Sequence, residues 1–275
     1  MWEMTHRIIS MYLFQFKKQV LDNWPTPDKE RITSTIRKNM ENTFAQSKAN
    51  DYSDFVDFWL SEHFYQEIED DALEPVIQKV IHNLEAFINS DYHQKIEQRF
   101  RKWHHIYIED PRRPNFEMMR VDVSHIPWLE NISILASPDF WIMFGENNYL
   151  ILDWKSGKER LDVSGITDQL RIYALKILLK QKNKDLWNRQ IEVYEVYLPS
   201  LNEKSGTIEQ EDIEHIINKI LEDVEYQKQF IVEQDVERNE PLGHTTFTRT
   251  SSEKKCAWCT FRSVCQKLKE IESSE

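Results

Sequence analysis

One stretch decides the fold: residues 137–155, SPDFWIMFGENNYLILDWK. Residues 140–144 are an aromatic and β-branched run, residues 145–148 have the composition of a tight turn, and residues 149–152 are a second apolar run. This pattern predicts two neighbouring β-strands joined by a short turn, with a polar residue at each open end.

The charged residues at the open end of this predicted hairpin point to a site. Because side chains alternate along a strand, Asp153 and Lys155 share one face, while Leu152 and Trp154 share the other. With Asp139, two carboxylates and a lysine meet where an apolar sheet ends. Charges beside a buried sheet are costly unless they pair or bind a metal. The stretch therefore predicts a site that holds a divalent cation next to a phosphate.

Upstream of this stretch the chain reads as helical. Apolar residues recur at helical spacing, and prolines at 25 and 27 close the first helix. Helices are predicted over residues 2–21, 29–47, 52–68, 73–88 and, after a cap at Asp91, to about residue 103.

The second half alternates strands and helices. Strands are predicted over residues 104–109, 116–123, 132–144, 149–154 and 191–198. Helices are predicted from 164 or 167 to 182 and over 213–232, followed by a polar connector at 233–250 and a last short helix. Strands that meet, then a helix, then another strand indicate an α/β fold with a mixed sheet flanked by helices.

Composition sets the class of protein. The chain has 275 residues, of which 40% are hydrophobic and nine are tryptophan, enough for one large domain or a core with added lobes. It has neither an apolar run of about 20 residues nor a beginning typical of a signal peptide, which predicts a soluble, cytoplasmic protein without membrane contact. The net charge of −12 argues against broad electrostatic wrapping of nucleic acid, but leaves room for a local basic groove.

Three cysteines lie within ten residues, at Cys256, Cys259 and Cys265. An odd, clustered set in a cytosolic chain favours a metal over disulfides, and free buried thiols are the alternative.

Several of these residues resemble the motifs of the PD-(D/E)xK nuclease superfamily, in its RecB-like branch, which includes the AddB and Cas4 nucleases. Pro138-Asp139 matches the first motif, and Asp153-Trp154-Lys155 matches the (D/E)-x-K motif. Gln169 and Tyr173 look like the Q-x-x-x-Y motif of the branch, and their spacing places them on one helix face. His6 is the residue most similar to the metal-binding histidine on the first helix of the branch.

The resemblance implies a restriction-endonuclease-like fold and a set of roles. It divides the chain into a helical lobe at 1–103, a nuclease core at 104–236 and a cysteine-bearing segment at 237–275. Lys155 would assist the attacking water, and the helix face of the Q-x-x-x-Y motif would orient that lysine and the DNA. The implied catalytic residues are Asp139, Asp153, Lys155, Gln169 and Tyr173, and the implied ligands of Mg²⁺ or Mn²⁺ are His6, Asp139 and Asp153.

The cysteines also resemble the C-x2-C-x5-C ending of the branch. There they supply three of the four ligands of a [4Fe–4S] cluster, and the fourth is a cysteine upstream of the first-helix histidine. Only five residues precede His6 here, and none is a cysteine. The chain could start downstream of the natural beginning, His244 or a partner could supply the ligand, or zinc could bind instead.

The activity that follows from the resemblance is hydrolysis of DNA by a metal-dependent nuclease that acts on single-stranded ends or flaps, with exonuclease and endonuclease action as the alternatives. The expected setting is DNA repair, recombination or anti-phage defence, alongside a helicase. The alternative is a non-catalytic DNA-binding or scaffold subunit with a nuclease fold, which the missing fourth cysteine and the acidic net charge motivate.

Overall fold

The computed structural model describes residues 2–49, 69–100, 102–109, 120–121, 134–145, 148–157, 165–180, 190–234, 238–243, 246–247, 250–257, 259 and 265. The helix predicted over 52–68 and His244 lie outside these residues. No helix in the described part of the chain is long and apolar enough to cross a membrane.

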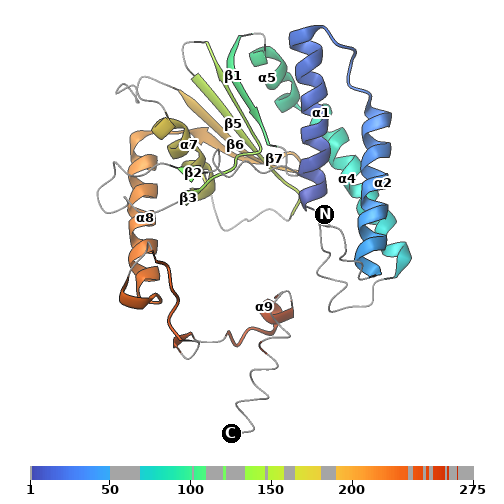
Figure 1. Cartoon of the computed structure of the whole chain (residues 1–275). Helices are drawn as coiled ribbons and strands as arrows, with labels where there is room; N and C mark the ends of the chain where they lie inside the picture. The colour runs from blue at the N-terminus through green and yellow to red at the C-terminus, as the bar shows by residue number, and fades with distance from the viewer. Residues whose placement is uncertain are drawn as a thin grey trace.

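A five-stranded mixed sheet forms the centre of the fold (Figure 1). Its strand order is β1-β4-β5-β6-β7; β5 and β6 are parallel, and the other neighbours are antiparallel. The predicted α/β class with a mixed sheet is confirmed. The strands are β1 (Trp103–Ile108), β4 (Phe140–Phe144), β5 (Asn148–Lys155), β6 (Ile191–Tyr197) and β7 (Asn202–Thr207), and a separate pair joins β2 (Arg120–Val121) to β3 (Ile134–Leu135).

Helices cover both faces of the sheet (Figure 1). One layer contains α1 (Trp2–Asp22), α2 (Lys29–Lys48), α4 (Leu73–Ile88) and α5 (Asp91–Phe100), and the other contains α7 (Asp168–Lys180) and α8 (Gln210–Lys228). The other helical elements in the described part of the chain are η1 (Asp70–Ala72), η2 (Val232–Gln234) and α9 (Glu253–Ala257).

The alternation predicted for the second strand of the hairpin holds in β5. Leu152 and Trp154 belong to the core beneath α1 and α4, where the ring of Trp154 lies 4.8 Å from that of Phe87. Tyr149 and Ile151 belong to the other core, beneath α7 and α8. Both faces of β5 are buried, which fits a strand in the middle of a sheet that has helices on both sides.

Two predicted boundaries were wrong. Asp91 does not cap α5 but is its first residue, and the hydroxyl of Ser90 lies 3.4 Å from the backbone N–H of His93. A serine hydroxyl at this position can accept from an amide of the first helical turn, so Ser90 takes the capping place. The helix ends at Phe100, and Trp103 starts β1 instead.

The single strand predicted over 132–144 is two strands with a break at residues 136–139. Pro138 lies in this break and has no backbone N–H to donate to a ladder. The break turns the chain so that Asp139 lies immediately before β4. Of the strand predicted over 116–123, residues 120–121 are described as β2.

Strand β7 was missed entirely. Its sequence, NEKSGT, is polar and poor in residues that favour strands, so periodicity gave no signal. It pairs with β6 across the short connection at residues 198–201, with Tyr197 opposite Asn202. Among the described strands, β7 is the last in the order of the sheet, and a polar strand is tolerated at such an edge.

We expect Leu152→Ala to lower the free energy of unfolding by about 2–5 kcal/mol, because Leu152 is 0% exposed in the centre of the sheet and its truncation leaves a cavity. Leu135→Ala is the matched control, since Leu135 is 58% exposed and its loss should change stability by no more than about 0.5 kcal/mol. Equilibrium urea unfolding measures both. Equal effects of the two substitutions would contradict the placement of Leu152 in the core.

Candidate active site

The pairing of β4 with β5 brings the two predicted aspartates together. Phe140 lies opposite Leu152, so Asp139, just before β4, is next to the residues that follow Leu152. The backbone N–H of Trp154 donates to Oδ2 of Asp139 at 2.6 Å. Both carboxylates are buried, with 4% exposure for Asp139 and 2% for Asp153.

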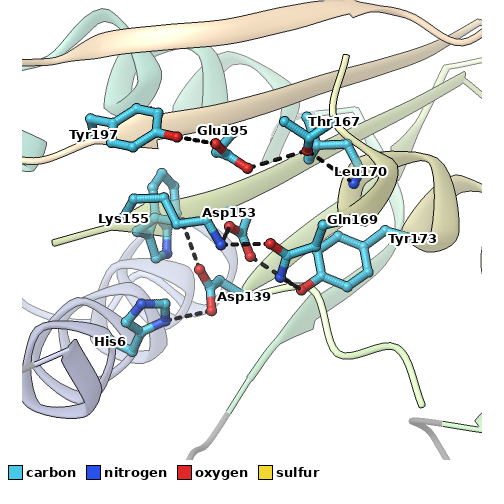
Figure 2. A network of polar contacts seen from close by, with 11 residues as sticks. His6, Asp139, Asp153, Lys155, Thr167, Gln169, Leu170, Tyr173, Glu195 and Tyr197 are labelled. Atoms are coloured by element: carbon cyan, nitrogen blue, oxygen red, sulfur yellow. Dashed lines mark hydrogen bonds and ion pairs between the residues drawn. The ribbon is translucent and has the colours of Figure 1, made fainter. Parts of the chain in front are cut away.

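The first helix adds a histidine to this pair. His6 Nδ1 lies 2.6 Å from Oδ1 of Asp139, and the histidine is 2% exposed. It reaches the sheet because its neighbours Ile8 and Ile9 are buried in the core beneath α1. Asp139 therefore links the first helix to β5, one oxygen for each (Figure 2).

Lys155 closes a ring of polar contacts with three other predicted site residues (Figure 2). Its Nζ pairs with Oδ2 of Asp153 and donates to Oε1 of Gln169 at 2.7 Å. The Gln169 amide donates to the Tyr173 hydroxyl at 2.6 Å, and that hydroxyl donates to Oδ1 of Asp153 at 3.2 Å. The ring fixes the position of the lysine ammonium between β5 and α7.

Burial and like charge shape the protonation of this site. Burial and the neighbouring Asp139 raise the pKa of Asp153 above its ordinary value. Burial opposes a charge on His6, but the carboxylates of Asp139 and Asp153 outweigh it and raise the pKa of the imidazole. Burial and Asp153 raise the pKa of Tyr173, so this hydroxyl stays a neutral donor.

Glu109 is a member of the cluster that the sequence analysis missed. It follows β1, and its backbone N–H donates to the carbonyl oxygen of Asp139 at 2.9 Å. The Ser137 hydroxyl donates to Oε1 of Glu109 at 2.6 Å. Burial and Asp139 raise the pKa of Glu109 to about 7. No local motif marks this residue; only the pairing of β1 with β4 brings it here.

The donor atoms of this cluster fit a divalent cation. One ligand atom each from His6, Glu109 and Asp139 lie within 4.8 Å of one another. Carboxylate oxygens are the ligands that Mg²⁺ and Mn²⁺ prefer, and an imidazole is compatible with a transition metal. Asp153 lies beside this group, with its two oxygens in contact with Lys155 and Tyr173.

Two further buried groups attach α7 to the site. Glu195, opposite Asp153 on β6, accepts from the hydroxyls of Tyr197 and Thr167. Thr167 precedes α7, and its hydroxyl lies 3.5 Å from a backbone N–H of the first turn. Further along α7, the ammonium of Lys176 donates to the carbonyl oxygen of Ala136, in the segment that carries Asp139. These contacts support the helix that presents the Q-x-x-x-Y pair.

The three cysteines are free and partly exposed in the structure. Cys256 lies on α9, and the backbone N–H of Cys259 donates to the carbonyl oxygen of Cys256 at 3.2 Å. This backbone hydrogen bond forms a turn that joins the first two cysteines. Their role as ligands of iron–sulfur or zinc stays a prediction.

We expect the metal-free protein to lose stability as the pH rises toward neutrality. The pKa of Glu109 rises from 4.5 to about 7 on folding, and those of Asp153 and His6 are raised as well. A group with a raised pKa in the folded state binds its proton more tightly there, so its contribution to stability is lost as the pH rises through that pKa.

Thermal melting in a chelating buffer at about pH 5 and about pH 8 measures this effect, because it follows the proton linkage of folding. Glu109→Gln, which removes one of the titrating groups, should show a smaller decrease between the two pH values. A decrease of the same size in the wild type and the variant would contradict the assignment.

A sequence model of the PD-(D/E)XK nuclease superfamily matches residues 34–266, which is more than half of the chain. The matched range includes Glu109 and the segment from Asp139 to Tyr173, and it begins after His6. No curated protein matches the chain.

Proposed function

Because the chain belongs to the PD-(D/E)XK nuclease superfamily, we propose that it is a metal-dependent DNA nuclease that hydrolyses phosphodiester bonds. The observation that carries the proposal is the closed ring of Asp153, Lys155, Gln169 and Tyr173 beside the buried Asp139. Burying several carboxylates together lowers the stability of the fold, and a bound cation would offset this loss.

His6, Asp139 and Asp153 would hold a Mg²⁺ or Mn²⁺ ion. The bound ion would supply Lewis-acid activation of the scissile phosphate and of a water molecule. Asp139 is suited to this place because contacts with His6 and the backbone of Trp154 fix its carboxylate. A carboxylate that is already oriented does not have to be ordered when the ion arrives.

Lys155 would position the attacking water and neutralise the charge that develops on the phosphate. Gln169 accepts a hydrogen bond from the ammonium of Lys155. Tyr173 donates to the carboxylate of Asp153, which pairs with that ammonium. The Q-x-x-x-Y pair would therefore act by orienting Lys155. It would also contact the DNA strand, as the resemblance implies.

The finer assignment follows the resemblance to the RecB-like branch. The proposed substrate is DNA with single-stranded ends, degraded as by an exonuclease. The proposed setting is DNA repair, recombination or anti-phage defence beside a helicase subunit. Cys256, Cys259 and Cys265 would bind a [4Fe–4S] cluster whose fourth ligand comes from elsewhere, with zinc as the less favoured ion.

Incubation of the purified protein with end-labelled single-stranded and double-stranded DNA tests the activity. Cleavage should require Mg²⁺ or Mn²⁺, stop on chelation and disappear in Asp153→Asn. Asp223→Asn is the control, because Asp223 is an exposed aspartate on α8, away from the site. Metal-independent DNA binding without cleavage would favour the alternative of a non-catalytic DNA-binding or scaffold subunit.

A further inference from the structure

Glu109 occupies a position that the proposed mechanism leaves unused. The backbone hydrogen bond from Glu109 to Asp139 continues the ladder of β1 and β4 by one residue, beyond the pair of Ile108 with Phe140. Residues that lie opposite each other in an antiparallel ladder have side chains on the same face, close to one another. Glu109 and Asp139 are therefore cross-strand neighbours of the same charge.

Such a pair destabilises a sheet unless something positive lies between the two carboxylates. The imidazole of His6 contacts Asp139 and completes a group of three ligand atoms within 4.8 Å of one another. This spacing suits three ligands on one side of a single ion. The hydroxyl of Ser137 is not one of these ligands. It donates to one oxygen of Glu109 and orients that carboxylate.

We propose that Glu109 is a further protein ligand of the divalent cation, in the same cluster as His6 and Asp139. The inference rests on the proposed function, since it assumes that this cluster holds the ion. Asp153 contacts Lys155 and Tyr173 through its two oxygens, so it connects this cluster to the ring around Lys155. Strand β4, which Asp139 precedes, lies between β1, which Glu109 follows, and β5, which carries Lys155. Glu109 therefore approaches Asp139 from the side away from Lys155.

The donor set also indicates which cation the site prefers. Two carboxylates suit both Mg²⁺ and Mn²⁺, but an imidazole ligand favours the transition metal. A site with His6, Glu109 and Asp139 therefore binds Mn²⁺ more tightly than Mg²⁺. Removing the charge of Glu109 weakens the binding of both ions and leaves the imidazole preference in place.

Titration calorimetry with MnCl₂ and MgCl₂ on the chelator-treated full chain tests the assignment. Glu109→Gln should weaken Mn²⁺ binding by at least about 10-fold, the lower bound expected for groups that support a metal site. Asp139→Asn should weaken it at least as much. Glu192→Gln is the matched control, because this part-buried carboxylate also lies on a strand of the sheet, β6, but pairs with Arg99 instead.

Thermal melting without metal shows whether each variant is folded. Glu109→Asp keeps the charge but shortens the side chain, and it replaces Glu109→Gln in the titration if that variant does not fold. Wild-type Mn²⁺ affinity in both Glu109 variants, together with lost affinity in Asp139→Asn, would overturn the role of Glu109 and leave the proposed nuclease site standing. A wild-type protein that binds neither ion would overturn both.

Discussion

Lys155→Ala is expected to lower the rate of DNA cleavage by about 100- to 1000-fold, which is typical when one preorganised group that stabilises transition-state charge is removed. The ammonium of Lys155 is held between Asp153 and Gln169, so its position is set before substrate arrives. Single-turnover cleavage at saturating Mg²⁺ measures the chemical step. Mn²⁺ affinity should stay close to the wild-type value, because Lys155 does not bind the ion.

Two further variants test whether the loss of activity comes from the charge of Lys155. Lys155→Met keeps the length of the side chain without the charge and should be as inactive as Lys155→Ala. Lys204→Met is the control, since Lys204 is a buried lysine on β7 of the same sheet, outside the ring around Lys155. Cleavage at the wild-type rate by Lys155→Met would remove the lysine from the mechanism.

Asp139→Asn is expected to lower metal-dependent cleavage by at least about 1000-fold, because a neutral amide replaces the carboxylate at the centre of the site. Asp139 contacts the imidazole of His6 and the backbone N–H of Trp154 and lies beside Asp153 and Glu109. The same substitution removes like-charge repulsion with Asp153 and Glu109 but also the buried contact with His6, so the two effects on metal-free stability oppose each other. Activity should therefore fall far more than the melting temperature of the metal-free variant changes.

Asp139→Ala separates the electrostatic effect from the packing effect. It also removes the charge, but it leaves the buried N–H of Trp154 without its acceptor, which costs about 1–3 kcal/mol. The melting temperature of Asp139→Ala should accordingly lie below that of Asp139→Asn. If both variants cleave DNA like the wild type, Asp139 has no part in the reaction.

The part of the fold that the sequence predicted is the part with local signals. The hairpin at residues 137–155 and its alternation could be derived because strand periodicity and turn composition lie within one short segment. The helix with Gln169 and Tyr173 was placed for the same reason. The family match and the α/β sheet support these predictions.

The parts that were missed depend on contacts between distant segments. Glu109 reaches the site only because β1 pairs with β4, and Glu195 only because β6 lies parallel to β5. Strand β7 has a polar sequence, so its pairing with β6 could not be read from apolar periodicity. These residues reach the site through the pairing of strands that are distant in the sequence. Motifs with a fixed spacing along the chain do not reveal such pairing.

The proposed mechanism requires a divalent cation at Asp139. Crystals grown with MnCl₂ and measured at the manganese absorption edge would locate the ion directly. One strong anomalous peak is expected within coordination distance of Asp139, with His6 beside it and Lys155 facing the same space. Manganese bound elsewhere in a protein that still cleaves DNA, with no peak at Asp139, would contradict the proposed metal site.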